Sequence, residues 1–414
     1  MTTPGEERLI YDWAVAGGAP PPARAVMLDD ETLRDGLQSP SVTDPPVETK
    51  IEILHLMNGL GIETADVGLP GAGPRQREAV ERLCSEIRDH KLRIRPNCAA
   101  RTVIADIQPI ADAVQKTGVP IEACVFIGSS PIRQYAEEWG LDRILRHTEE
   151  AVRFAVSEGL EVMYVTEDTI RAHPDDLRQL LTAAVRAGAR RICLCDTVGA
   201  AVPQGVRNLV TWAGKLLAEL GVADRVGIDW HGHRDRGLDV ANTLAAVEAG
   251  ATRVHGTALG VGERVGNTPI ELLLVNLKLL GWRNDDLTTL PAYSAAVASA
   301  VGVPIPANWP VVGRDAFRTA TGVHAAAVIK AQKKGADWLA DRIYSGVPAS
   351  WVGRTQEIEI GHMSGGSNVL HYLRTRGLPT DQAVVEAVIA LAKRSERLLT
   401  EQEVLEVVQA VARG

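Results

Sequence analysis

The sequence is poor in aromatic side chains, which make up 4% of its 414 residues, and it contains five cysteines. No two cysteines are spaced as C-x-x-C and their number is odd, so we expect buried small side chains rather than a disulfide framework. No apolar run is long enough to span a bilayer, and no secretory signal peptide is evident. A net charge of −8 argues against nucleic acid as the main partner. These absences predict a cytoplasmic protein that does not enter membranes.

Apolar residues make up 45% of the chain and recur in short runs of strand length. Eight strands are expected, at residues 25–30, 62–68, 92–98, 121–128, 160–166, 190–196, 226–230 and 252–257. Segments with helical spacing lie between them, as at 48–60, 75–88, 141–157 and 238–249, and a last helix is expected at 268–280. Eight β-α units in series favour an α/β fold of the (β/α)8 type, a TIM barrel, over a doubly wound sheet.

The pattern divides the chain into three parts. Residues 1–20 mix charge with glycine and proline and are predicted to form a flexible lead-in. Residues 21–285 form the predicted barrel, and residues 286–414 a mainly helical C-terminal appendage of small-domain size. Within that appendage, Thr400 and Glu403 have the spacing of a capping box that starts a helix.

Two histidines one residue apart, His231 and His233, end one of the apolar runs. Alternate residues of a strand point to the same face, so their imidazoles are expected to project together. Asp35 follows a different run and is a candidate third ligand. Two nitrogens and one oxygen suit a divalent ion such as Zn²⁺, Mn²⁺ or Co²⁺. The histidine pair alone is a weak signal, because a strand of any protein can carry two structural histidines.

Other polar residues also follow predicted strands. They are Asp35 after the first strand, Glu167 after the fifth, Thr197 after the sixth and Asn267 after the eighth. In a TIM barrel the chemistry lies at the C-terminal ends of the strands, so these residues are expected to converge on one rim. Taken alone, Thr197 is nearly as well explained as a residue of a strand-end turn.

Several ordered motifs resemble those of one family, the DRE-TIM metallolyases, and within it the 2-isopropylmalate, homocitrate and citramalate synthases. The motifs are residues 31–38, 196–199, 231–233 and 260–267, followed by 321–324 and by Tyr344 ten residues before Arg354. The resemblance covers nearly the whole chain from about residue 25. It departs from the family after the histidine pair, where Arg234-Asp235-Arg236-Gly237 replaces the usual Asn-Asp-Leu-Gly.

The resemblance implies a role for each matching residue in metal and keto-acid binding. Asp35, His231 and His233 would hold a divalent metal (Mn, Mg, Zn or Co), and the Asn267 amide oxygen could reach the metal or a bound water. Arg34 would stabilise an alkoxide on the keto oxygen, although a structural ion pair with a neighbouring acid also explains it.

The remaining matches concern proton transfer and substrate orientation. His324 and Tyr344 match the base and its companion, which the appendage supplies, often from a partner subunit. Glu167 matches the acid that assists them. Thr197 could bind the substrate carboxylate, and Gln38 could orient acetyl-CoA or the keto acid.

The implied reaction is a Claisen condensation of acetyl-CoA with a 2-oxo acid, which gives a 2-alkylmalate and free CoA. The implied assembly is a homodimer with a shared active site. Typical 2-isopropylmalate synthases carry a further leucine-binding domain, for which residues 375–414 are too short and too helical. Leucine feedback of the usual kind is therefore not expected, which favours a role in a specialised pathway.

The keto acid is indicated by two positions on the fifth strand. In homocitrate synthases an arginine at the position of Met163 pairs with the distal carboxylate of 2-oxoglutarate. Met163 and Val165 are apolar, which favours 2-oxoisovalerate or a similar apolar keto acid, because an unpaired buried charge is costly. Arg133 near the rim leaves open a diacid or phosphonate keto acid, although binding of CoA phosphates or a surface ion pair explains it equally.

Three other functions compete with the synthase. A hydroxymethylglutaryl-CoA lyase uses a cysteine in the glycine-rich loop after strand eight, but no cysteine follows Cys195. A carboxyltransferase needs a metal-bound lysine at the end of a middle strand, where this chain has residues 194–197, which include no lysine. A non-catalytic barrel would have to retain every expected catalytic position without using it.

Overall fold

The computed structural model describes residues 5, 9–11, 13, 25–335 and 337–413, so the predicted lead-in at residues 1–20 lies mostly outside the described residues. The chain divides into two compact units, one of residues 20–304 and the other of residues 1–19 and 305–414. No helix among the described residues is long and apolar enough to cross a membrane.

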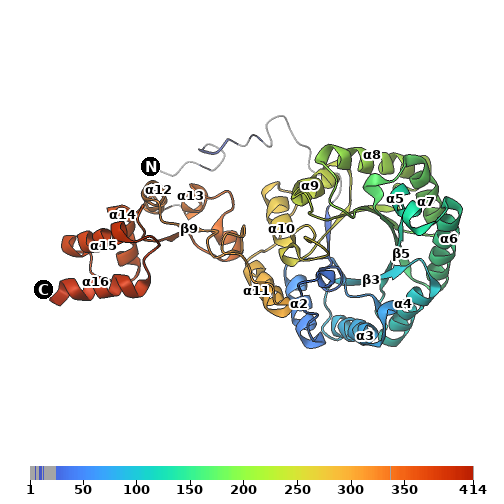
Figure 1. The fold of residues 1–414 in the computed structure, drawn as a ribbon, viewed down its shortest axis with the longest axis horizontal. Coiled ribbons are helices and arrows are strands. Elements are labelled where there is room, and N and C mark those ends of the chain that lie inside the picture. Colours follow the sequence, from blue (N-terminus) through green and yellow to red (C-terminus); the bar gives the residue numbers. More distant parts are fainter. Residues whose placement is uncertain (1–4, 6–8, 12, 14–24, 336, 414) are drawn as a thin grey trace. The chain divides into compact units, whose positions relative to one another are not determined.

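The first unit is a closed barrel of parallel strands in the order β1 to β8 (Figure 1). The strands are β1 Met27–Asp30, β2 Thr64–Asp66, β3 Arg95–Arg101, β4 Glu122–Gly128, β5 Glu161–Glu167, β6 Arg191–Asp196, β7 Gly227–Gly232 and β8 Arg253–Gly256. The barrel closes where β1 pairs with β8, with Met27 opposite Arg253. The predicted TIM barrel is confirmed, and every predicted run overlaps one of its strands.

Helices connect the strands and surround the barrel (Figure 1). They are α2 Val47–Gly59, α3 Pro74–Asp89, α4 Ile104–Thr117, α5 Pro131–Glu137, α6 Leu141–Ser157, α7 Pro174–Ala187, α8 Pro203–Glu219, α9 Asp239–Ala249, α10 Ile270–Leu279 and α11 Leu290–Val301. Short 3-10 helices lie at Gly36–Gln38, Pro70–Ala72, Thr169–Arg171 and Ala258–Gly260. The predicted helix at 141–157 matches α6 at both ends.

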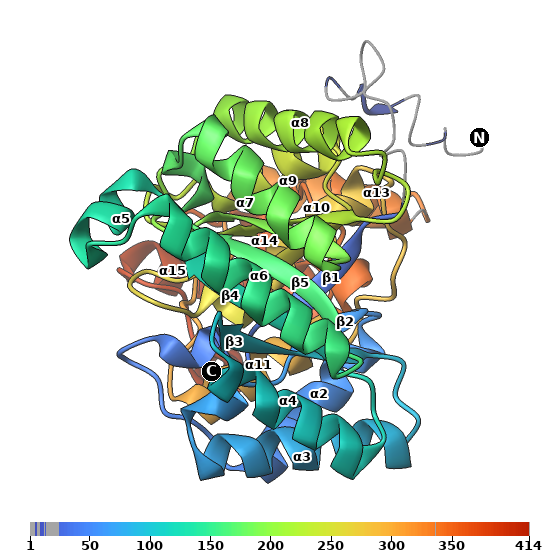
Figure 2. The ribbon, with the colours of Figure 1, turned by 90° about the vertical axis from the view of Figure 1, so that its right-hand side faces the viewer.

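Strand β5 illustrates how the barrel separates core from lumen. Its outward-facing Tyr164 is fully buried, and the Tyr164 hydroxyl lies 2.8 Å from the Thr148 hydroxyl of α6. Helix α6 lies against the outer side of β4 and β5 (Figure 2). Because side chains alternate along a strand, Met163, Val165 and Glu167 face the lumen instead. The hydrophobic core therefore lies between the strands and the helices, and the side chains that face the lumen are available for a functional site.

The second unit is mainly helical, as predicted for the C-terminal part. Its elements are β9 Arg318–Thr319, α12 Gly322–Gln332, α13 Asp337–Arg342, a 3-10 helix at Ala349–Val352, β10 Glu357–Ile358, α14 Gly366–Thr375, α15 Gln382–Arg394 and α16 Glu401–Arg413. The two short parallel strands were not predicted, since two residues carry no alternation that could be recognised. The predicted capping box is confirmed: the Glu403 amide donates to the Thr400 hydroxyl at 3.3 Å, and the Thr400 amide donates to the Glu403 carboxylate at 2.8 Å.

Candidate metal centre and active site

A cavity of about 270 Å³ opens at the C-terminal ends of the barrel strands. Eight of the predicted functional residues line it: Arg34, Asp35, Gln38, Met163, Glu167, Thr197, His231 and His233. They come from the ends of β1, β5, β6 and β7, as the TIM-barrel topology requires. The structure thus brings together residues that are up to two hundred positions apart in the sequence.

The two histidines face each other across this cavity. Their Nε2 atoms lie 3.3 Å apart, and the Asp35 Oδ2 atom lies 4.0 Å from His233 Nε2. The potential ligand atoms of Asp35, His231 and His233 all lie within 4.8 Å of one another. Asn267 lies beside these ligand atoms, because its Nδ2 donates to Asp35 Oδ2. Its buried Oδ1 has no hydrogen-bond partner.

These donors fit a divalent metal ion. Two imidazole nitrogens that each lie about 2.0–2.1 Å from one Zn²⁺ are roughly 3 Å apart, close to the separation of the two histidines. Imidazole and carboxylate donors suit zinc, manganese and cobalt. A buried amide oxygen without a donor is costly unless something pairs with it, so Asn267 Oδ1 is also suited to face a cation or its water.

Arg34 joins this centre through ion pairs with three acids. Its guanidinium lies 2.6 Å from Asp66, 2.8 Å from Asp35 and 3.4 Å from Glu31. Burial alone would raise the pKa of Asp35, but the charges of Arg34, His231 and His233 together lower this pKa. Asp35 is therefore held ionised, as a metal ligand must be. Arg34 therefore does form ion pairs with neighbouring acids, and its guanidinium also lines the cavity.

Glu167 ends β5 at the wall of the same cavity. Burial raises its pKa, although the Arg133 guanidinium opposes the shift. The Arg133 Nε lies 4.0 Å from Glu167 Oε1, and its terminal nitrogen lies 3.2 Å from Glu137. Arg133 is therefore near the rim, in contact with two carboxylates.

Thr197 follows β6, where it is both a residue of the strand-end turn and a residue of the cavity wall. Its hydroxyl oxygen accepts a hydrogen bond from the Asp168 amide at 2.8 Å, which fixes the turn after the strand. The hydroxyl still has its own proton to donate, and the side chain lines the cavity.

One side of the cavity is apolar. Cys124, Met163, Cys193 and Cys195 form a buried cluster, against which Val165 packs. All five cysteines of the chain are unpaired and buried, as predicted. This apolar wall is suited to a hydrocarbon substituent, because an ionised group there would lose its hydration.

His324 and Tyr344 lie in the second unit, on and near its helices α12 and α13. Their rings are stacked, with centroids 4.1 Å apart and an interplanar angle of 29°. Both side chains are exposed. The structure therefore brings this predicted pair together within the second unit.

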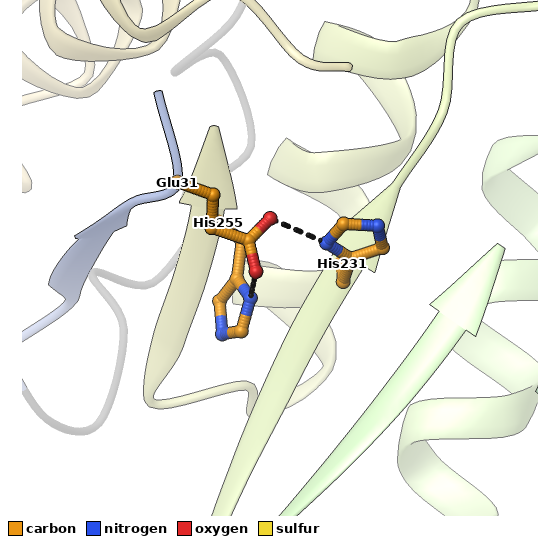
Figure 3. A group of neighbouring side chains, drawn as sticks. All are labelled: Glu31, His231 and His255. Carbon is orange, nitrogen blue, oxygen red and sulfur yellow. Dashed lines mark hydrogen bonds and ion pairs between the residues drawn. The ribbon is translucent and has the colours of Figure 1, made fainter. Parts of the chain in front are cut away.

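Sequence reasoning missed Glu31 and His255. Both line the cavity, and Glu31 lies between His231 and His255 (Figure 3). A signal was available, because His255 is in a predicted strand and Glu31 directly follows another, so each stood at a position able to face the lumen. What the sequence lacks is any indication that positions 224 residues apart are in contact.

Comparison with known proteins shows relatives over almost the whole chain. Homocitrate synthase AksA from Methanopyrus kandleri is 32% identical over 393 residues, which cover 93% of this chain and 92% of that protein. A 2-isopropylmalate synthase from Sulfolobus acidocaldarius is 31% identical over 370 residues, with coverage of 89% and 90%.

Solved structures share the fold. An HMG-CoA lyase from Acenitobacter baumannii, in complex with coenzyme A and 3-methylmalate, matches with a TM-score of 0.57 at 22% identity, covering 68% of this chain and 93% of that one. The HMGL-like family model matches residues 25–297. The chain therefore belongs to the HMGL-like family of DRE-TIM barrels, as its motifs predicted.

Proposed function

We propose that this chain condenses acetyl-CoA with a 2-oxo acid and that water then hydrolyses the resulting thioester, which gives a 2-alkylmalate and free CoA in a reaction that depends on a divalent metal. The observation that carries the proposal is the convergence of Asp35, His231 and His233 beside Arg34 in one cavity. Relatives named as synthases of homocitrate and 2-isopropylmalate support it.

Asp35, His231 and His233 would hold the metal, with the Asn267 amide oxygen as a further donor. When bound, the metal would supply a Lewis acid that polarises the keto carbonyl of the substrate. Arg34 would donate hydrogen bonds to the oxygen on which negative charge develops. Its ion pairs with neighbouring acids fix the guanidinium before the reaction, so little reorganisation would be needed.

Thr197 would donate its hydroxyl proton to the substrate carboxylate, since its oxygen is already fixed by the Asp168 amide. Gln38 is exposed and lines the cavity, which suits a role in orienting acetyl-CoA. Arg133 would contact substrate or CoA phosphate only if it exchanged its contacts with Glu137 and Glu167.

The condensation also needs a base that removes a proton from the acetyl methyl group. We assign this role to His324, with Tyr344 stacked on it and Glu167 assisting from the barrel. Histidine suits proton transfer near neutral pH. Because His324 and Tyr344 are exposed in the second unit, they are available to another subunit, and we infer a homodimer in which the pair of one subunit completes the site of the other.

The apolar wall formed by Cys124, Met163, Val165, Cys193 and Cys195 favours a keto acid with an apolar side chain, such as 2-oxoisovalerate. A second carboxylate buried beside Met163 and Val165 would find the Arg253 guanidinium already paired with Asp229 and Glu122. The test is release of CoA thiol from acetyl-CoA with Mn²⁺ or Mg²⁺, across 2-oxoisovalerate, pyruvate, phenylpyruvate, 2-oxoglutarate, oxaloacetate and phosphonopyruvate.

We expect the fastest release with 2-oxoisovalerate. A chelator should abolish it and added Mn²⁺ should restore it, whereas Asp35→Ala should stay inactive with added Mn²⁺. Absence of thiol release with all of these acids would overturn the proposed reaction.

A further inference from the structure

A chain of ionisable side chains runs through the barrel lumen from His231. The His231 Nδ1 atom, on the side of the ring opposite His233, lies 2.7 Å from Glu31 Oε2. The other oxygen of Glu31 lies 3.0 Å from His255 Nδ1, so one carboxylate bridges two imidazoles (Figure 3). Glu31 follows β1, whereas the histidines belong to β7 and β8.

The chain continues toward the other end of the barrel. His255 Nε2 lies 3.0 Å from Asp229 Oδ2, which also accepts from Arg253 Nε at 2.5 Å. Arg253 in turn donates to Glu122 at 2.6 Å. Glu31, Asp229, Arg253 and His255 are each at most 3% exposed. Positive and negative groups thus alternate along a path of largely buried side chains.

This alternation determines where the protons lie. Each ring nitrogen of His255 faces a carboxylate oxygen, and a carboxylate can only accept, so both nitrogens must carry a proton. Burial alone would lower the pKa of His255, but its anionic neighbours raise it well above the usual value. His255 is therefore a buried cation that compensates the charges of Glu31 and Asp229.

Glu31 is accordingly ionised. Each of its two oxygens faces an imidazole nitrogen, that of His231 at 2.7 Å and that of His255 at 3.0 Å. Its Oε2 lies in ion-pair contact 2.7 Å from His231 Nδ1 and has no hydrogen-bond partner elsewhere, so a proton of this ring is favoured at Nδ1. A metal-binding imidazole is neutral and has one proton, which leaves the lone pair on His231 Nε2, the atom that faces His233.

We propose that Glu31, oriented by His255, is a positioning residue that holds His231 in the tautomer whose Nε2 can bind a metal. The inference rests on the proposed metal centre and deepens it. Outer partners of metal-binding histidines fix both the ring orientation and the tautomer, and their loss typically weakens metal affinity by about 10–100-fold. Glu31 would act through His231.

A metal could instead occupy a separate position among Glu31, His231 and His255, whose ligand atoms also lie within 4.8 Å of one another. The proton arrangement argues against it, because both nitrogens of His255 already face carboxylates. The number of ions bound per chain distinguishes the two arrangements.

The test is titration of the full chain with Co²⁺, followed by calorimetry and by the visible absorption of the bound ion. Glu31→Ala should raise the Kd for Co²⁺ by about 10–100-fold and change the absorption spectrum. The matched control is Glu122→Ala, which removes a carboxylate from the far end of the same buried chain without touching His231. We expect it to change the Kd by less than about threefold, within the ordinary range of context effects.

Thermal unfolding of each variant shows that the barrel is intact. An unchanged Kd in Glu31→Ala, or an equal loss in both variants, would overturn the inference. So would two Co²⁺ ions per unaltered chain, one of which is lost in Glu31→Ala while the other keeps its Kd. Failure of the unaltered chain to bind Co²⁺ would overturn the metal centre as well, whereas binding without condensation activity would overturn only the proposed reaction.

Discussion

The Nε2 atoms of His231 and His233 lie 3.3 Å apart at the C-terminal end of β7. With Asp35 Oδ2 4.0 Å from His233, they form a set of donors at the floor of the barrel cavity. Two nitrogens this close can share one proton or one cation, and the carboxylate of Asp35 beside them favours the cation.

His233→Ala should therefore remove metal binding. Loss of this ligand is expected to raise the Kd for Mn²⁺ by at least about 100-fold, which is more than the loss of a residue that only hydrogen-bonds to a ligand. It should also abolish CoA release. His362→Ala removes an exposed imidazole of the second unit and should change neither quantity. Equal metal binding by the two variants, measured by equilibrium dialysis, would argue against this ligand set.

Met163 offers a test of substrate choice. Its side chain is buried in the apolar wall, with its sulfur 3.1 Å from the Arg253 guanidinium. Met163→Arg adds a charge that an apolar keto acid cannot pair, so kcat/KM for 2-oxoisovalerate should fall by about 10–200-fold relative to that for 2-oxoglutarate. Met163→Leu keeps the volume and should preserve the preference. An unchanged ratio in Met163→Arg would place the substrate side chain elsewhere.

The shared site can be tested by complementation. Asp35→Ala lacks a barrel ligand and His324→Ala lacks the proposed base, so each homodimer should be inactive. Co-expression should restore about a quarter of the activity, because half of randomly paired dimers combine the two variants and each of those has one intact site. Inactivity of a mixture that sedimentation shows to contain mixed dimers would contradict a site shared between subunits.

Asp30 should make stability depend on pH. Its buried carboxylate accepts hydrogen bonds from the Thr32 amide and the Tyr293 hydroxyl, but burial still raises its pKa to about 6. Between about pH 4 and 6 the folded state keeps a proton that the unfolded chain has lost, so this group's contribution to stability falls as the pH rises and is constant above that range.

Asp30→Asn removes this titration. Relative to the unaltered chain, the variant should gain roughly 3 kcal/mol in free energy of unfolding between about pH 4 and 7, the equivalent of a shift of about two pKa units. Urea unfolding at each pH measures the difference. A difference that stays the same at every pH would show that Asp30 does not titrate as described.

Much of the fold could be predicted because each β-α unit carries a local signal. The run at 190–196 became Arg191–Asp196, since aliphatic and sulfur side chains fill both faces of a buried strand. The third strand was placed three residues early, because Arg95 and Asn97 interrupt its apolar pattern while the small Ala99 and Ala100 extend it to Arg101. Local composition locates a strand better than it locates its ends.

The candidate site was partly predictable for the same reason. Asp35, Glu167 and Thr197 were found because strand ends mark the rim of a barrel. The contact of Asn267 with Asp35 spans 232 positions and was expected only as a meeting of two strand ends at one rim. No local pattern indicates that Tyr293 of α11 reaches Asp30 across 263 positions. The roles of His324 and Tyr344 stay predictions, which the complementation experiment addresses.

The most direct test of the central claim follows the acetyl carbon itself. Acetyl-CoA with a ¹³C-labelled methyl group, incubated with 2-oxoisovalerate, Mn²⁺ and the full chain, is monitored by ¹³C NMR. The proposed condensation predicts that the label appears in a methylene group of a 2-alkylmalate, with one CoA released for each product molecule. Label that remains in acetyl-CoA, or that appears only in free acetate, would contradict carbon–carbon bond formation by this enzyme.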